Sequence, residues 1–429
     1  MHKYKIFTIL KRNQLIKSGL QNSTQVIVRL VIGVLNIKVL ALFVGPSGMA
    51  IISQLQNFLQ LGSNISGLGF NNGIIKYISS NQSAPQRQKI YFSSALIIII
   101  ISSMCTSAIA LIFSNKISII LFNSSEYNNV IKLSGIYFLS SSILNGYISY
   151  INGLQQIKQY VNINILISTS GFIIGLLAAY TLNLDGLLWA QIFLVIFPLT
   201  LNIPRLVKLL NTQKIAFSKK ALKNLSKYSF MALVAGILTP VSQTVIRTII
   251  TSDSSWESAG IWDGMNKISF SYISFVTMSF TYYFLPTFSS LKTNRDIIKE
   301  VHKSLITLIP FLIIGGISSF LLKRHIVNIL FTESFSLMYT LYIWQVIGDF
   351  FKILAWVIGF LFIARENIKI FIITEIISGI LMISLAKILI SLKMPLNLYY
   401  AIENGIYFIL MYTCFFFIYI KNNKSDIIK

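Results

Sequence analysis

The sequence predicts an all-α polytopic membrane protein with twelve transmembrane helices. The chain of 429 residues is 55% hydrophobic and only 11% charged, and its mean hydropathy is +0.72. A helix needs about 20 apolar residues to cross a bilayer, and twelve windows of the sequence are at least that long. Lys and Arg gather in alternate connections between these windows, as they do in multi-pass proteins.

The twelve windows follow one another with short connections. They cover about residues 15–44, 47–78, 88–113, 129–154, 158–182, 185–210, 225–251, 257–290, 296–321, 336–364, 366–390 and 395–420. The second, eighth and tenth windows exceed the minimum length, which predicts helices that tilt or project beyond the bilayer. No connection is long enough to hold a catalytic domain.

The distribution of basic residues predicts the orientation of the chain. Most of the 36 Lys and Arg residues fall on one side if both termini are cytoplasmic, in agreement with the excess of positive charge in cytoplasmic loops. The net charge of +23 is therefore mainly a signal of topology. Attraction to anionic membrane lipids is the alternative explanation, and nucleic-acid binding gains no support. Cys105 and Cys414 fall in apolar windows and are predicted to be small core residues.

The chain has the pattern of a duplication. Residues 211–224 form the most polar connection and are predicted to be a cytoplasmic linker between two six-helix lobes, 1–210 and 225–429. The pair Leu121-Phe122, followed by a short polar segment and a helical window, recurs 209 residues later as Leu330-Phe331. Since six is an even number, the two lobes enter the membrane in the same direction and are predicted to be related by a pseudo-twofold axis along its normal. This architecture is typical of transporters, and duplication without transport is the alternative.

Polar residues share one face of several predicted helices, because residues three or four apart lie on the same side. The residues of the first, second and seventh windows that we select as candidates for substrate binding are Asn22, Gln25, Arg29, Asn57, Asn64, Gln243 and Arg247. Interhelical hydrogen bonds are the alternative role for the uncharged members. Arg29 and Arg247 have no acidic residue in their own stripes and are interpreted as lining an aqueous cavity, since an unmatched guanidinium costs at least ~3 kcal/mol in the membrane.

Four acidic residues inside the predicted helices are candidates for ion coupling, with a proton or sodium as the ion. Asp263 lies one turn from Lys267, and Asp349 lies three residues from Lys352, so each acid is predicted either to form a neutralised pair or to belong to a site. Glu375 and Glu403 are either partners of basic residues on neighbouring helices or titratable coupling groups. The sequence does not choose between these alternatives.

Several enzyme classes are excluded. The three histidines are not at metal-ligand spacing, and the sequence has neither a phosphate-binding glycine loop nor an Asp-rich cation motif. The sequence therefore predicts no catalytic residue, no metal and no cofactor.

Five strings carry a resemblance to a known family. They are Phe43–Met49, Gly73–Tyr77, Trp256–Gly264, Phe284–Phe288 and Trp344–Lys352. Together they resemble the Wzx family of O-antigen and enterobacterial common antigen flippases, over about residues 15–420, and most closely its lipid III translocase branch. This family belongs to the multidrug/oligosaccharidyl-lipid/polysaccharide exporter superfamily.

The resemblance implies two lobes around a central cavity that opens alternately to each side of the bacterial inner membrane. The implied cargo is an undecaprenyl-diphosphate-linked oligosaccharide, and a polysaccharide polymerase and a chain-length regulator are implied partners. Arg29 and Arg247 carry over as residues of a cationic cavity, and Lys267 carries over less securely because Asp263 is one turn away.

Two rival functions remain open from the sequence. A multidrug antiporter of the same superfamily would favour an acidic cavity, against which Arg29 and Arg247 argue. A polytopic glycosyltransferase, such as an O-antigen polymerase or ligase, would use a large periplasmic loop, whereas all the predicted periplasmic connections are short.

The orientation predicts a labelling pattern. In a background without Cys105 and Cys414, single cysteines at Ser47, Asn183 and Ser255 should react from the periplasm with an impermeant thiol reagent. Single cysteines at Ser83, Asn211 and Asn294 should stay unreactive until the membrane is opened. The reverse pattern would contradict the orientation assigned from Lys and Arg.

Overall fold

A computed structural model describes residues 24–211, 217–365 and 367–421, and within these ranges the chain is helical without a β-strand. The all-α prediction is confirmed. The helices in chain order are Thr24–Phe43, α2 (Gly45–Gly67), α3 (Phe70–Ser80), α4 (Pro85–Ile112), α5 (Ser114–Phe122), α6 (Asn128–Gly153), α7 (Ile157–Phe193), α8 (Ile196–Asn211), α9 (Lys219–Asp253), α10 (Trp256–Ser290), α11 (Asn294–Leu321), α12 (Lys323–Leu330), η1 (Glu333–Phe335), α13 (Met338–Ala364), α14 (Ile368–Ser391), α15 (Leu398–Phe415) and η2 (Phe416–Lys421).

Eight helical stretches of the described chain are long and apolar enough to cross a bilayer. A helix such as α13, with 27 residues, is longer than the ~30 Å hydrocarbon core at a rise of about 1.5 Å per residue. The windows at α2–α3, α6 and α10 are also helical but do not meet the same criterion of hydropathy. Twelve membrane crossings therefore remain a prediction.

The second window contains a break where a single tilted helix was expected. Leu68 and Gly69 have φ of 50° and 64°, so α2 ends at Gly67 and α3 begins at Phe70. Glycine adopts this left-handed conformation at little cost, whereas leucine pays roughly 1 kcal/mol or more. A second break occurs at Asn183 (φ 48°, ψ −123°), between the fifth and sixth windows.

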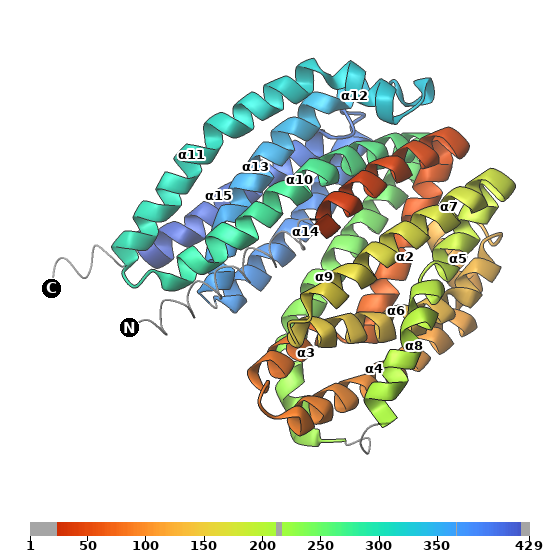
Figure 1. Cartoon of the computed structure of the whole chain (residues 1–429). Coiled ribbons are helices and arrows are strands. Elements are labelled where there is room, and N and C mark those ends of the chain that lie inside the picture. The colour runs from red at the N-terminus through yellow and green to blue at the C-terminus, as the bar shows by residue number, and fades with distance from the viewer. Residues whose placement is uncertain (1–23, 212–216, 366, 422–429) are drawn as a thin grey trace. The chain divides into compact units, whose positions relative to one another are not determined.

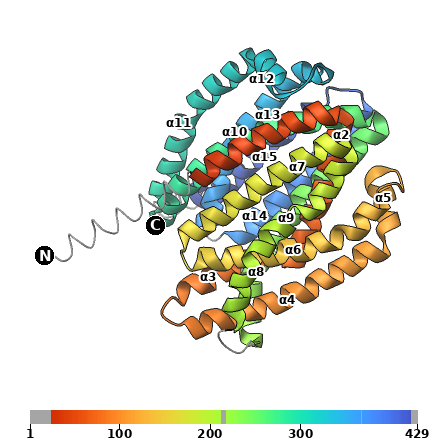
Figure 2. The same ribbon diagram turned by 45° about the vertical axis from the view of Figure 1, so that its right-hand side comes forward.

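The chain divides into two compact units. Unit 1 comprises Met1–Val39 and Gln54–Ile237. In its described part α6 packs against α3, α4 and α7, and Figures 1 and 2 show α4 beside α6. The core of this unit includes Phe92, which contacts Tyr150 with 4.6 Å between ring centroids.

Unit 2 comprises Leu40–Ser53 and Leu238–Lys429 and is built around α13. This helix packs against α10, α11, α14 and α15 (Figure 1). Its buried apolar side chains, such as Val357 and Leu361, share a core with Phe284 and Met411. At the start of α10, a Cβ atom on Gly260 would overlap the carbonyl group of Pro46, so only glycine permits this approach.

The described units share one sequence of elements. Unit 1 contains a long, a short and a long helix as α4, α5 and α6, and unit 2 contains the same order as α11, α12 and α13. In each unit the two long helices pack together. Phe122 and Phe331, from the recurring Leu-Phe pair, are both buried. This order agrees with a duplication, while the predicted lobes and their symmetry remain predictions.

Candidate functional site

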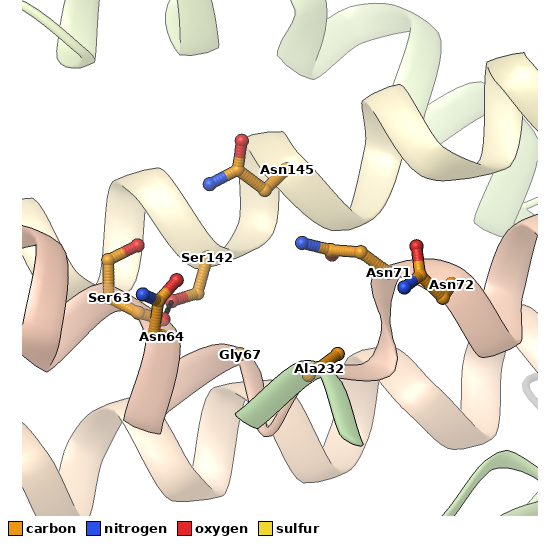
Figure 3. A pocket seen from close by; sticks show the side chains of 9 residues that line it. Ser63, Asn64, Gly67, Asn71, Asn72, Ser142, Asn145 and Ala232 are labelled. Atoms are coloured by element: carbon orange, nitrogen blue, oxygen red, sulfur yellow. Dashed lines mark hydrogen bonds between the residues drawn. The ribbon is translucent and has the colours of Figure 1, made fainter. Parts of the chain in front are cut away.

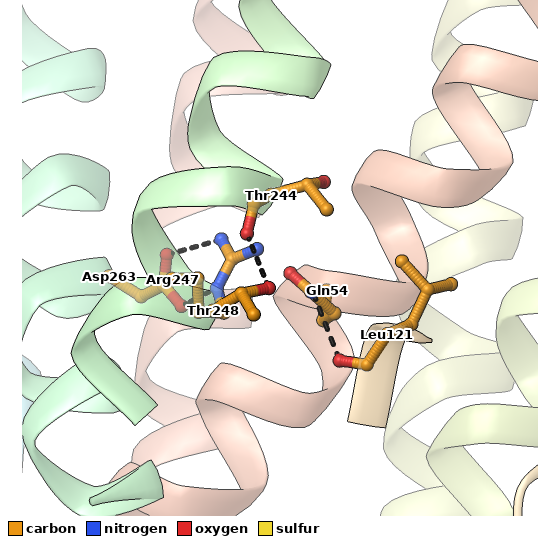
Figure 4. Close-up of polar contacts among 6 residues, drawn as sticks. All are labelled: Gln54, Leu121, Thr244, Arg247, Thr248 and Asp263. Atoms are coloured by element: carbon orange, nitrogen blue, oxygen red, sulfur yellow. Dashed lines mark hydrogen bonds and ion pairs between the residues drawn. The ribbon is translucent and has the colours of Figure 1, made fainter. Parts of the chain in front are cut away.

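The first polar group of unit 2, the Arg247 centre, consists of Arg247, Asp263 and Trp262. Arg247 donates from Nε to Asp263 Oδ2 and from Nη2 to Oδ1, each at 2.7 Å (Figure 4). The guanidinium lies 5.6 Å from the centroid of the Trp262 ring, and Arg247 is only 1% exposed. This bidentate geometry is the strongest form of an Arg–carboxylate pair, and it neutralises the charge of the guanidinium.

The local sequence explains why these two side chains meet. α9 ends at Asp253 and α10 begins at Trp256, so the connection is very short. Ser255 caps α10 by accepting a hydrogen bond from the Ser258 amide at 3.1 Å. The two helices therefore form a helical hairpin in which residues of similar distance from the turn are neighbours.

Two sequence-based interpretations are wrong here. Arg247 is paired and does not line a cavity as an unmatched charge, and Asp263 pairs with Arg247 and not with Lys267. Lys267 is half-buried on α10 and forms no ion pair with the described residues. Helical spacing identified only partners on the same helix, and it could not identify a partner across the hairpin.

The second polar group, the Asp349 centre, consists of Ser269 and Tyr272 of α10, Gln345 and Asp349 of α13, and Tyr400 of α15. Asp349 is 2% exposed. Its Oδ1 accepts from Ser269 Oγ and Tyr400 Oη at 2.6 Å each, and from Gln345 Nε2 at 3.5 Å. Its Oδ2 accepts from the Tyr272 hydroxyl. Hydrogen bonds from three hydroxyls compensate a carboxylate that is buried away from water.

Lys352 does not pair directly with Asp349, so that alternative is also wrong. Its Nζ donates to Tyr400 Oη at 3.4 Å and lies 5.5 Å from the ring centroid of Trp356. Tyr400 therefore stands between the cation and the acid, accepting from Lys352 while donating to Asp349.

The other two acidic candidates are also bonded to hydroxyls. Glu375 accepts from Tyr407 Oη at 2.6 Å, and Glu403 accepts from Ser378 Oγ at 2.5 Å. Neither forms an ion pair within the residues that the structure describes. One of the two predicted alternatives was that these acids pair with basic residues on neighbouring helices. The described residues form no such pair.

The candidates of unit 1 differ in their surroundings. Arg29 is exposed on the helix Thr24–Phe43 and has no acidic partner in the described part of the chain. Gln25 and Asn57 are each 7% exposed, and each keeps one buried side-chain amide atom without a hydrogen bond. Asn64 donates to the Gly236 carbonyl at 2.5 Å. Asn22 lies outside the described residues.

Gln243, the remaining candidate, is half-buried on α9 in unit 2. No group of three or more His, Cys, Asp and Glu residues in the described chain is arranged to hold a metal ion. The Asp349 centre nevertheless offers carboxylate, hydroxyl and amide groups, whose oxygens are the ligands that hard cations prefer.

Sequence reasoning missed the hydroxyl partners of the acids. Tyr400, Glu403 and Tyr407 fall at helical spacing on α15 and form a stripe that the sequence already contains. Asn397, the residue just before this helix, donates from Nδ2 to Gln345 Oε1 at 2.6 Å and extends the Asp349 centre. By contrast, the contacts of Ser269 and Tyr272 with Asp349 join residues about 80 positions apart, and no local pattern predicts them.

The chain is similar to characterised proteins over most of its length. The family described as polysaccharide biosynthesis protein matches residues 15–292. The lipid III flippases of Escherichia coli (strain K12) and Shigella flexneri are each 28% identical over 370 residues, which cover 84% of this chain and 88% of theirs.

Solved structures of membrane transporters have a similar fold. An inward-facing multidrug resistance MATE family transporter of the MOP superfamily matches with a TM-score of 0.72 and 12% identity, over 93% of this chain and 99% of that one. An outward-facing structure of such a transporter matches with a TM-score of 0.65 and 12% identity, over 95% and 97%. These similarities confirm that the chain has an all-α fold like that of these structures.

The Arg247 centre yields a test by double substitution. Arg247→Met or Asp263→Leu alone should lower the stability of the purified protein by roughly 3 to 5 kcal/mol, because each leaves an uncompensated buried charge. The double variant should recover most of this loss in a thermal unfolding measurement. Lys303→Met is the control, since Lys303 is 66% exposed in its 4.0 Å pair with Glu300 and should change stability by less than about 1 kcal/mol. Equal stability of the single variants and the wild type would contradict the buried pair.

Proposed function

The chain belongs to the polysaccharide biosynthesis protein family, and from this premise we propose that it is a flippase for lipid-linked oligosaccharides. It moves an undecaprenyl-diphosphate-linked oligosaccharide, an O-antigen or enterobacterial common antigen unit, from the cytoplasmic to the periplasmic leaflet of a bacterial inner membrane by alternating access. The observation that carries this proposal is the similarity to lipid III flippases, which extends over 84% of this chain and 88% of theirs. Both termini are cytoplasmic, and the polymerase and chain-length regulator of the same glycan are partners.

A diphosphate with a sugar chain needs a polar route because its charge and hydroxyl groups would otherwise lose their water. Arg29 is the first candidate for the diphosphate, since its guanidinium is exposed and has no acidic partner among the described residues. Lys267 is the second candidate. The amides of Gln25, Asn57, Asn64 and Gln243 are suited to the uncharged glycan. Arg247 can take part only by exchanging Asp263 for a phosphate oxygen.

The Asp349 centre is the coupling site of this proposal. A proton on Asp349, or a sodium ion beside it, removes an acceptor from the hydroxyls of Ser269, Tyr272 and Tyr400, which belong to α10 and α15. Binding the ion therefore changes how three helices are held together, and this is the kind of two-state element that coupled transport requires. Asp263, Glu375 and Glu403 are secondary candidates.

A multidrug antiporter is the second candidate function, favoured by the buried acids of unit 2. Such an antiporter would differ from the proposed flippase in its cargo, which would be a cationic molecule that carries no glycan.

Accumulation of the cargo tests the proposal. A strain that lacks this gene should build up an undecaprenyl-diphosphate glycan in the cytoplasmic leaflet, and the wild-type gene should remove it. Arg29→Ala at matched abundance should remove little, whereas Arg29→Lys should retain part of the activity, because Lys binds phosphate only as a point charge. Lys116→Ala, a change of an exposed cation on α5, is the matched control and should behave as the wild type. Export of cationic drugs without an effect on the glycan would favour the antiporter.

The coupling proposal yields a prediction for Asp349→Asn in proteoliposomes. The variant cannot take up a proton at this position, so flipping driven by a proton or sodium gradient should fall by about tenfold or more, as for the loss of a charge-assisted interaction. Asp185→Asn, at an exposed position, is the control. If Asp349→Asn is abundant and keeps a normal response to the gradient, coupling resides elsewhere.

A further inference from the structure

Unit 1 contains a polar cavity of about 150 Å³. Its walls come from α2, the break after it, α3, α6 and α9. The polar residues that line it are Ser63, Asn64, Asn71, Asn72, Ser142 and Asn145, and Figure 3 shows their side chains around the open space. This volume is large enough for several waters, or for one sugar ring in their place.

The lining contains four carboxamides and two hydroxyls but no charged side chain. Each carboxamide both donates and accepts hydrogen bonds, whereas a carboxylate only accepts and an ammonium only donates. The side-chain amides of Asn71, Asn72 and Asn145 have no hydrogen-bond partner among the residues that the structure describes. Interhelical bonding therefore does not account for them.

The break between α2 and α3 lies in the wall of this cavity. Irregular backbone at membrane depth is tolerated only where it is buried in protein or lines a polar cavity, and interrupted helices commonly form substrate sites. At Gly69 a Cβ atom would come within 2.6 Å of the Ser229 carbonyl and 3.2 Å of Ala232 Cβ on α9. The tight contact with α9 thus holds the break in place, and the amides on either side of it are positioned in advance of any ligand.

We propose that this cavity is a binding subsite for a neutral sugar ring of the lipid-linked glycan. The inference rests on the proposed flippase function and assigns the glycan, not the diphosphate, to this part of unit 1. A sugar ring carries hydroxyl groups that both donate and accept hydrogen bonds, and the amides of the lining match this pattern. A diphosphate would need cationic partners, which the lining lacks. A cavity that only hydrates the helix break is the alternative.

Binding measurements on the purified full chain in nanodiscs test the subsite. The probes are undecaprenyl diphosphate that carries a short neutral oligosaccharide, and undecaprenyl diphosphate alone. The double variant Asn71→Ala/Asn145→Ala should bind the glycan-bearing probe about tenfold or more weakly than the wild type, as expected for two lost hydrogen bonds. Its affinity for the bare diphosphate lipid should be unchanged. Asn115→Ala, an exposed asparagine on α5, is the control, and thermal unfolding confirms that the variants are folded.

Three results would overturn the inference, each in a different way. Equal losses for both probes would assign the cavity to the diphosphate. Unchanged affinity for both probes in a folded double variant would mean that the cavity binds no sugar and only holds water around the helix break. If the wild type binds neither probe, the flippase proposal itself fails, and the glycan subsite fails with it.

Discussion

A polar group inside a bilayer must be neutralised, hydrogen-bonded or kept wet, and the interior of this chain follows that constraint. Arg247 meets it through a bidentate pair with Asp263, at 2.7 Å for each bond. Asp349 meets it without a cation, through the hydroxyls of Ser269, Tyr272 and Tyr400. Both solutions take their partners from neighbouring helices, so the same bonds that compensate the charges also fix how α9, α10, α13 and α15 pack.

The two units satisfy the constraint to different degrees. In unit 2 the buried acids all have partners, and a change in any of their charges has to rearrange neighbouring side chains. In unit 1 the amides of Asn71, Asn72 and Asn145 line a cavity and have no hydrogen-bond partner among the described residues. A buried carboxylate surrounded by hydroxyl groups suits the binding of a small ion, and an open set of neutral amides suits a hydroxylated ligand. This difference supports our proposal that the ion and the glycan of the transport cycle bind to different units.

The all-α, membrane-spanning class of the fold could be predicted from the sequence because helix length and hydropathy are local properties. The windows fall on helices of the described chain, and the repeated Leu-Phe pair at Phe122 and Phe331 ends a short helix in each unit. The site was less predictable, because the residues that pair or form hydrogen bonds in it lie on different helices. Helical spacing placed Lys267 beside Asp263 and Lys352 beside Asp349, yet the first acid pairs across a hairpin and the second is bonded to hydroxyls from two other helices. The length of the second window predicted a tilted or projecting helix, but not the left-handed break at Leu68 and Gly69.

The pairing of Arg247 with Asp263 also bears on how tightly a flippase can hold its cargo. An unmatched guanidinium in a low-dielectric site would bind a diphosphate strongly and release it slowly, which would limit turnover. When a guanidinium that is already paired with a carboxylate binds a phosphate, its bonds to Asp263 are lost as the new bonds form. The free energy of binding is then only the difference between the free energies of the two ion pairs. Arg29, which is exposed and has no acidic partner among the described residues, would reach a similar result by a different route wherever water screens its charge. If these residues meet the diphosphate of the proposed cargo, both arrangements keep the attraction moderate, and a carrier that has to bind on one side and release on the other requires such moderation.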